Sequence, residues 1–262
     1  MVRFTIFVDG SNLNGSLKNL GLFVDDYDKF FKFILDQALS LWRASIISGS
    51  VDVRLVRVLW YEVGSIDEWD LNNPKVKTQI RDWFNKNGDL KSVYLAKVGA
   101  GLKGKGFEVI ADEAWELCFS EITTWYNQKK DYVNGLRDFH FGVRSHTDFI
   151  DIIECGHLKV DILDRRIDEK GLDTFLAVDM VALADTYDVA LVVSGDADSI
   201  PSVQRIKQKG KHVGVIEFIR GYPPEKKGRE SSSKLKAEAD FVIPIYEVDL
   251  QQKGVASTKK RT

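Results

Sequence analysis

The sequence predicts an α/β protein with a central parallel sheet covered by helices on both faces. Two observations support this: short apolar runs rich in strand formers, and intervening stretches with apolar residues at helical spacing. The two kinds of element alternate along most of the chain, an order typical of parallel sheets. We expect strands at 4–8, 51–61, 92–98, 189–193, 213–218 and 241–245, and helices at 25–40, 74–87, 171–184 and 199–209.

Several segments do not show this alternation of strands and helices. Residues 11–24 read as a loop, 99–110 as a Gly-rich basic turn, and 221–236 as a mobile basic loop. The aromatic and charged stretch 111–156 reads as a partly helical insertion within a single domain spanning 1–250. Residues 251–262 are expected to be a disordered basic tail. The helix at 171–184 (GLDTFLAVDMVALA) is apolar on almost every side, so we expect it to be buried.

Composition excludes several classes of protein. The chain has 262 residues, 44% of them hydrophobic, which rules out a chain that is disordered throughout. A net charge of −2 argues against a uniformly basic nucleic-acid coat. The two cysteines cannot form a disulfide framework, and no apolar run is long enough for a membrane helix. With no secretory signal in the first residues, we expect a cytoplasmic protein without a membrane partner.

Two of the apolar runs end in aspartate. Asp9 follows 4–8, and Asp196 and Asp198 follow 189–193. Ligands of open α/β sheets bind beyond the carboxyl ends of the strands, so these acids meet there if the two strands are neighbours. Their mutual repulsion would be relieved by a divalent cation, and Mg²⁺ or Mn²⁺ prefers such oxygen ligands. The alternative is that each aspartate only caps a helix or turn.

A third acidic group starts the apolar helix at 171–184. Asp173 lies in its first turn, where the helix dipole favours a carboxylate, and Asp179 lies further along. At 100° per residue these two side chains are about 120° apart, so they do not easily bind one ion together. We therefore expect Asp173 to be a ligand and Asp179 an inner hydrogen-bonding group.

Three motifs in this order resemble the NYN domain, the LabA-like branch of the PIN-like nucleases. They are 7–12 (FVDGSN), 170–173 (KGLD) with Asp179, and 194–201 (SGDADSIP). The resemblance covers about 4–245 apart from the insertion. It departs at Ser199, where the family usually has an aromatic residue.

The resemblance implies a three-layer α/β/α sandwich and metal-dependent cleavage of single-stranded or structured RNA. It places the catalytic acids on Asp9, Asp173, Asp196 and Asp198, with Asn12 beside them to bind a phosphate oxygen or a water. We expect Mg²⁺ or Mn²⁺ as cofactor, with Asp179 and Ser194 supporting the ligands. The main alternatives are a non-catalytic RNA-binding protein that keeps the fold, and a DNA nuclease.

Basic residues are concentrated near the end of the chain. Residues 220–262 contain 10 Lys or Arg against 6 Asp or Glu. Within this region we expect Lys226, Lys227 and Arg229 to guide the phosphate backbone toward the acids. Lys170, beside the second motif, is a further candidate phosphate contact, although it is equally compatible with ordinary surface charge.

Other motifs are weaker. Residues 99–106 (GAGLKGKG) nearly spell a phosphate-binding loop, but Gly106 has no hydroxyl and no clear helix is expected to follow. His140, His146, His157 and Cys155 fit no zinc spacing and are expected to be surface histidines and a buried thiol. Trp115, Trp125 and Tyr126 either pack the insertion or stack on bases. The insertion is expected to cap the site or to join two copies in a homodimer.

Overall fold

The computed structural model describes all residues except 47–50, 100, 102–103, 224–231 and 259–262. The chain forms two compact units. The first comprises Met1–Val63, Asp138–Gly156 and Gly171–Thr262, and the second comprises Gly64–Arg137 and His157–Lys170. The 111–156 segment therefore contributes residues to both units.

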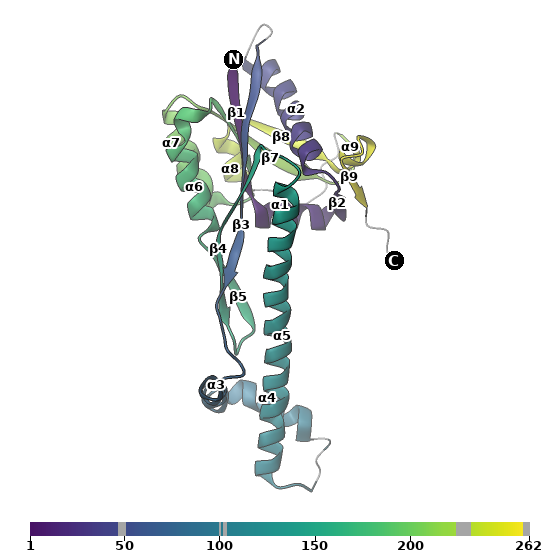
Figure 1. Ribbon diagram of the computed structural model, residues 1–262, viewed down its shortest axis with the longest axis vertical. Helices are drawn as coiled ribbons and strands as arrows, with labels where there is room; N and C mark the ends of the chain where they lie inside the picture. Colours follow the sequence, from purple (N-terminus) through teal and green to yellow (C-terminus); the bar gives the residue numbers. More distant parts are fainter. Residues whose placement is uncertain (47–50, 100, 102–103, 224–231, 259–262) are drawn as a thin grey trace. The chain divides into compact units, whose positions relative to one another are not determined.

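A seven-stranded sheet has the order β5-β4-β3-β1-β6-β7-β8 (Figure 1). The β3–β1, β1–β6, β6–β7 and β7–β8 pairs are parallel, and β5 is antiparallel to β4. The fold is thus the expected α/β fold with a mostly parallel sheet. The strands are β1 (Val2–Asp9), β3 (Val53–Ile66), β4 (Ile150–Asp161), β5 (Arg166–Lys170), β6 (Val189–Val193), β7 (His212–Ile219) and β8 (Phe241–Tyr246).

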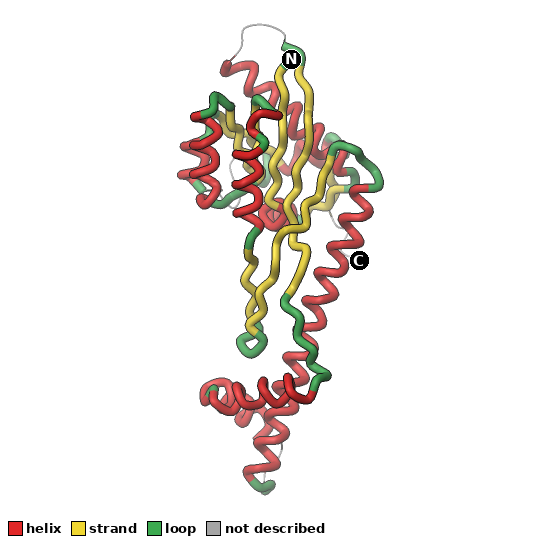
Figure 2. Tube along the Cα trace, turned by 60° about the vertical axis from the view of Figure 1, so that its left-hand side comes forward, coloured by secondary structure: helices red, strands yellow, loops and turns green. Residues whose placement is uncertain are grey.

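Helices cover both faces of this sheet in the first unit (Figure 2). Alternate side chains of β1 enter separate cores, because successive strand residues point to opposite faces. Ile6 and Val8 pack with α1 and α2, and Phe7 packs with α6, α7 and α8. These helices are α1 (Gly10–Leu20), α2 (Tyr27–Ile46), α6 (Leu172–Ala182), α7 (Ile200–Gln208) and α8 (Ser233–Glu238), and a short 3₁₀ turn, η1 (Ala184–Thr186), follows α6.

The second unit has its own core. Phe84, Tyr94, Trp115 and Tyr126 are buried in it, so Trp115 and Tyr126 pack the core rather than presenting open faces to bases. Trp125 is partly buried against the same core. The helices are α3 (Pro74–Lys86), α4 (Gly88–Gly99) and most of α5 (Phe107–Arg144).

Several of the described helices lie where the sequence suggested other structure. The expected loop at 11–24 is α1 followed by β2 (Leu22–Val24), because Asp9 caps a helix whose leucines all face one side. The expected strand at 92–98 lies in α4, since Asn87 caps its start and Tyr94 is buried against Phe84. The expected absence of a helix after the Gly-rich turn was also wrong, because α5 begins at Phe107.

The C-terminal region is more ordered than expected. The tail prediction for 251–262 was wrong up to Thr258: α9 (Glu247–Gln252) is followed by β9 (Ala256–Thr258), which pairs with β2. Residues 233–236 of the predicted loop form the start of α8. The helix at 171–184 is also less buried than expected, because Phe175 and Val178 are 50% and 57% exposed.

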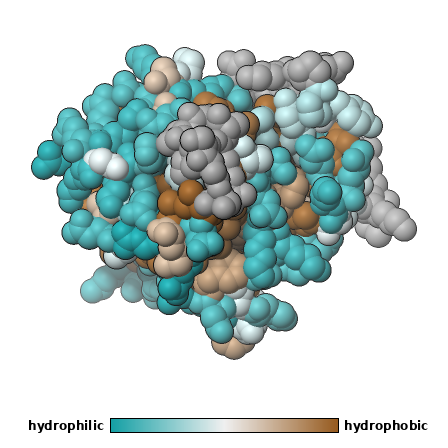
Figure 3. All heavy atoms as spheres, turned by 90° about the horizontal axis from the view of Figure 1, so that it is seen from above, coloured by the Kyte–Doolittle hydropathy of each residue, from teal (hydrophilic) through white to brown (hydrophobic). Residues whose placement is uncertain are grey.

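The described helices include none that is both long and apolar enough to cross a membrane. The face of the molecule seen in Figure 3 is mostly hydrophilic, with hydrophobic side chains in smaller patches.

Candidate functional site

Asp9 is the last residue of β1, at the centre of the sheet. Its side chain is 2% exposed, and its Oδ1 accepts a hydrogen bond of 2.9 Å from the backbone N–H of Asn12. Asp9 therefore caps α1, the alternative weighed for it above. Capping also fixes the carboxylate at the carboxyl end of the strand, so this role is compatible with a place in a functional site.

Asn12 links Asp9 to the loop after β6. Its Nδ2 donates to Asp9 Oδ2, and its Oδ1 accepts from the backbone N–H of Gly195 at 3.1 Å. The strands on either side are direct neighbours, with Val8 opposite Val193 in the β1–β6 register. The carboxyl ends of β1 and β6, where the aspartates lie, are therefore adjacent, and the side-chain amide of Asn12 connects them.

The loop after β6 is held by its own side chains. The backbone N–H of Asp196 donates to Ser194 Oγ at 3.1 Å, and that of Asp198 donates to Asp196 Oδ1 at the same distance. Asp196 thereby caps the short 3₁₀ turn η2 (Ala197–Ser199). Ser194 is buried, whereas Asp196 and Asp198 are exposed. The acids of this loop are accessible to a ligand.

Asp173 lies in the first turn of α6. Its side chain reaches the surface, yet partial burial of the carboxyl raises its pKa above the usual value. The negative charges of Asp9, Asp196 and Asp198 raise the pKa further. The acids that the resemblance grouped are therefore close enough to influence one another electrostatically.

Asp179 lies on the same helix but points elsewhere. Its Oδ2 accepts a hydrogen bond of 2.9 Å from the hydroxyl of Tyr61, which is opposite Asp9 in the β1–β3 register. Burial, followed by the charge of Asp179, raises the pKa of Tyr61. This contact ties α6 to the sheet beside the acids.

The predicted phosphate-binding residues have no described contact with these acids. Lys170 is exposed at the end of β5, opposite His157, and belongs to the second unit. Lys226, Lys227 and Arg229 lie outside the described residues.

Two buried glutamates were not singled out from the sequence. Glu62 Oε1 accepts 3.0 Å hydrogen bonds from Trp60 Nε1 and Asn14 Nδ2, and a Cβ on Gly10 would lie 2.3 Å from its Cδ. Glu217 in β7 is 6% exposed and forms a 2.8 Å ion pair with Lys236. A signal existed for Glu62, because it directly follows the apolar run 58–61 as Asp9 follows 4–8. Glu217 gave only the weaker signal of an acid within an apolar run.

The donor set suits a hard divalent cation. Carboxylate and amide oxygens are the ligands that Mg²⁺ and Mn²⁺ prefer. After burial, the charges of Asp9, Asp196 and Asp198 raise the pKa of Asp173, and a cation would offset that negative charge. Among the described residues, however, no three His, Cys, Asp or Glu side chains are already arranged to hold an ion. Binding would therefore require side-chain movement, for which the exposed Asp173, Asp196 and Asp198 have room.

His140 and His157 have acidic partners, and Cys155, expected to be a buried thiol, is only half-buried. His157 Nε2 lies 2.7 Å from Asp67 Oδ1, and His140 Nδ1 lies 3.3 Å from Glu154 Oε1. The expectation of a surface position was wrong for His140, which is fully buried. Burial raises the pKa of the Cys118 thiol to about 11, so that thiol is inert at neutral pH.

Comparisons with known proteins identify one family. The model of the NYN domain matches residues 69–246, a range that includes Asp173, Asp196 and Asp198 but not Asp9 or Asn12. No curated protein matches the chain. The crystal structure of a protein of unknown function from Vibrio parahaemolyticus is 16% identical, with a TM-score of 0.43 and 94% coverage of both chains.

Proposed function

Because the chain belongs to the NYN domain family, we propose that it is a metal-dependent ribonuclease, acting as an endonuclease through Asp9, Asp173, Asp196 and Asp198. NYN domains belong to the PIN-like nucleases, so a nuclease activity follows from the family, and the substrate and metal are our proposal. The observation that supports it most is that β1 and β6 are direct neighbours and that Asn12 connects Asp9 to the loop carrying Asp196 and Asp198, so these acids share one end of the sheet. Burial, followed by the charges of these three acids, raises the pKa of Asp173. Such a concentration of negative charge is costly without a cation to offset it.

Asp9, Asp173 and Asp196 would hold Mg²⁺ or Mn²⁺, and Asp198 would bind a second ion or orient a water. When bound, the cation would polarise a phosphoryl oxygen and lower the pKa of a bound water. The buried Asp9 is the fixed member of this set, whereas Asp196 and Asp198 lie on an exposed loop.

Asn12 has a different role in this proposal from the one expected from the sequence. Its amide is already engaged by Asp9 on one side and by Gly195 on the other. We therefore assign it to positioning: it sets the distance between the β1 acid and the β6 loop. Asp179 supports α6 in the same way through Tyr61.

The test compares cleavage of labelled single-stranded RNA and DNA of one sequence in Mn²⁺, Mg²⁺ or EDTA. We expect the wild type to cleave RNA with either metal and EDTA to stop it. Asp196→Asn should lower the rate at least about 100-fold, the scale seen when an electrostatic stabiliser is lost. Asp188→Asn, which removes an acid just before β6, is the matched control and should cleave normally.

Other outcomes decide between the alternatives. Equal or preferred cleavage of DNA would assign a DNA nuclease. RNA binding without cleavage in any metal would assign a non-catalytic binding protein. Cleavage that survives both EDTA and Asp196→Asn would contradict the proposed site.

A further inference from the structure

The second unit contains a half-open cavity of about 530 Å³ that the acidic site does not use. It is lined by Trp69 and Trp83, which we call its walls, and by residues of the β4–β5 hairpin, which we call its floor. Cavities of this size hold small organic ligands. One nucleotide of a nucleic-acid strand is a ligand of that size.

The two tryptophans form an aromatic corner. Their ring centroids are 5.9 Å apart, and the rings are inclined at 77°. Both side chains are only half-buried, unlike Trp115 and Tyr126 in the core beneath them. The part of each tryptophan that lines the cavity is available to a planar group, and bases stack on aromatic side chains in this way.

The Trp69 wall is fixed in place by its backbone. The Trp69 N–H donates to the Tyr126 hydroxyl at 2.8 Å, and that hydroxyl donates to the Asp67 carbonyl at 2.9 Å. Asp67 is in turn held to β4, because its Oδ2 accepts from the Val160 N–H at 2.9 Å. A ligand would therefore meet a preformed surface, which lowers the entropic cost of binding.

The floor carries balanced charge. In the β4–β5 register Lys159 is opposite Asp168, and Asp161 is opposite Arg166. All four line the cavity, so it offers both hydrogen-bond donors and acceptors without a net charge. This pattern suits a nucleotide, which combines a flat apolar face, N–H and carbonyl groups at the base edge, and an anionic phosphate. A purely anionic or purely cationic ligand would meet as much repulsion as attraction.

We infer that this Trp69–Trp83 cleft holds one base of a single-stranded RNA by stacking, outside the acidic site. The choice of RNA rests on the proposed function, whereas the stacking rests on the cleft alone. Because the floor is neutral, binding here is driven by the base rather than by the phosphate. Losing the cleft should therefore weaken binding while leaving its salt dependence unchanged.

The experiment measures binding of a fluorescein-labelled 12-nucleotide oligoadenylate RNA to the full chain, by anisotropy in EDTA at several salt concentrations. We expect Trp69→Ala and Trp83→Ala each to weaken binding about 10-fold or more, within the range for one stacked base. The slope of log affinity against log salt should stay at the wild-type value. Phe107→Ala, at a 67% exposed aromatic of the same unit that does not line the cavity, is the matched control and should bind normally.

Two further measurements guard against misfolding. Trp69→Phe and Trp83→Phe keep a stacking ring and should restore most of the affinity, with unfolding temperatures close to wild type. An abasic oligomer of equal charge should bind the wild type and the alanine variants alike. Normal RNA binding by both alanine variants would overturn the inference, as would an equal loss of affinity for the abasic oligomer.

Failure of this inference is distinguishable from failure of the proposed function. RNA cleavage by the wild type, with binding insensitive to both tryptophans, would overturn the cleft alone. Tryptophan-dependent RNA binding without cleavage in any metal would overturn the proposed function and support the cleft.

Discussion

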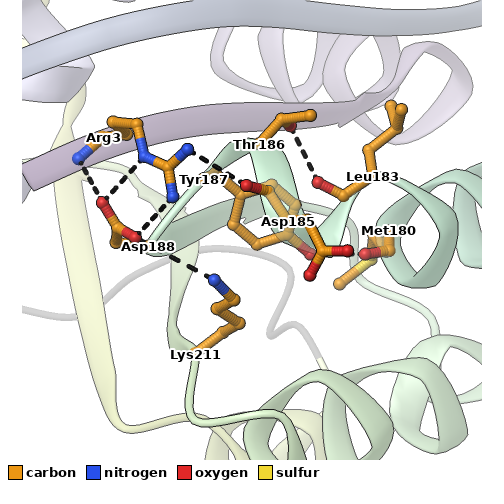
Figure 4. Close-up of polar contacts among 8 residues, drawn as sticks. All are labelled: Arg3, Met180, Leu183, Asp185, Thr186, Tyr187, Asp188 and Lys211. Atoms are coloured by element: carbon orange, nitrogen blue, oxygen red, sulfur yellow. Dashed lines mark hydrogen bonds and ion pairs between the residues drawn. The ribbon is translucent and has the colours of Figure 1, made fainter.

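Asp188, at the amino end of β6, has cationic side chains as neighbours. The aspartates at the carboxyl ends of β1 and β6 instead have other aspartates as neighbours. Figure 4 shows Asp188 facing the Arg3 guanidinium, which donates to it at 2.8 and 3.1 Å, with Lys211 on its other side at 3.9 Å. These contacts lower the pKa of Asp188 to about 2, and the hydrogen bond from Arg3 is the largest cause. Burial and three neighbouring acids instead raise the pKa of Asp173.

The contrast separates two uses of a carboxylate on one scaffold. At the amino ends, ion pairs neutralise the charge and stabilise the fold. At the carboxyl ends, within the described residues, no Lys or Arg forms an ion pair with Asp173, Asp196 or Asp198. Charge repulsion at the carboxyl ends of the strands, with neutralised charge at their amino ends, is expected where the acids bind a ligand.

The largest effect on stability is expected at the amino ends. Asp188→Asn should lower the free energy of unfolding by about 1 kcal/mol, a value discounted for solvent screening because both side chains are about one third exposed. A double-mutant cycle with Arg3→Gln, followed by urea unfolding, should recover most of that loss as coupling energy.

Asp173→Asn is the matched variant for this comparison. It removes one negative charge from the acids at the carboxyl ends of the strands, and it should leave the protein as stable as the wild type or slightly more stable. An equal loss of stability in Asp188→Asn and Asp173→Asn would contradict the contrast between the amino and carboxyl ends of the strands.

A smaller effect is expected in the pH dependence of stability. The lowered pKa of Asp188 contributes stability above its ordinary value of 3.8, and this is lost as pH falls through 3.8 toward 2. The raised pKa of Asp173 has the opposite sign: its ionised form costs stability at neutral pH, and that cost vanishes below about 3.8.

Thermal unfolding between pH 2 and 7 checks both signs. Asp188→Asn should differ most from the wild type at neutral pH and converge with it at the acidic end. Asp173→Asn should gain a small advantage at neutral pH that disappears on acidification. An advantage of Asp173→Asn that grows toward low pH would contradict the assigned cause.

Much of the fold could be predicted from sequence because burial dominates its elements. The run at 189–193 is buried on both faces, and it coincides with β6. The failures came where tertiary packing or capping outweighed local preference. The stretch at 92–98 is rich in strand formers, but burial of Tyr94 in the second unit holds it as α4. Pairing between β2 and β9 joins segments too short to stand out on their own.

The candidate site could be predicted from the sequence for a different reason. Aspartate at the end of an apolar strand is visible in the sequence, and parallel strands bring such ends to one edge. The tie from Asn12 to Gly195 was not visible, because it depends on which strands are neighbours. The Trp69–Trp83 cleft was also missed, since the contact between the two rings depends on tertiary packing that the sequence pattern does not show. The role of the 111–156 segment and a homodimer both stay predictions.

The central claim is that the acids at the carboxyl ends of β1 and β6 form one cation-binding cluster. Isothermal titration of Mn²⁺ into the metal-free full chain tests it most directly, with Asp196→Asn and Asp188→Asn alongside the wild type. We predict that the wild type and Asp188→Asn bind Mn²⁺ with the same affinity, and that Asp196→Asn binds at least about tenfold more weakly, on the scale of metal-site substitutions. Equal Mn²⁺ affinity in all three proteins would contradict the account.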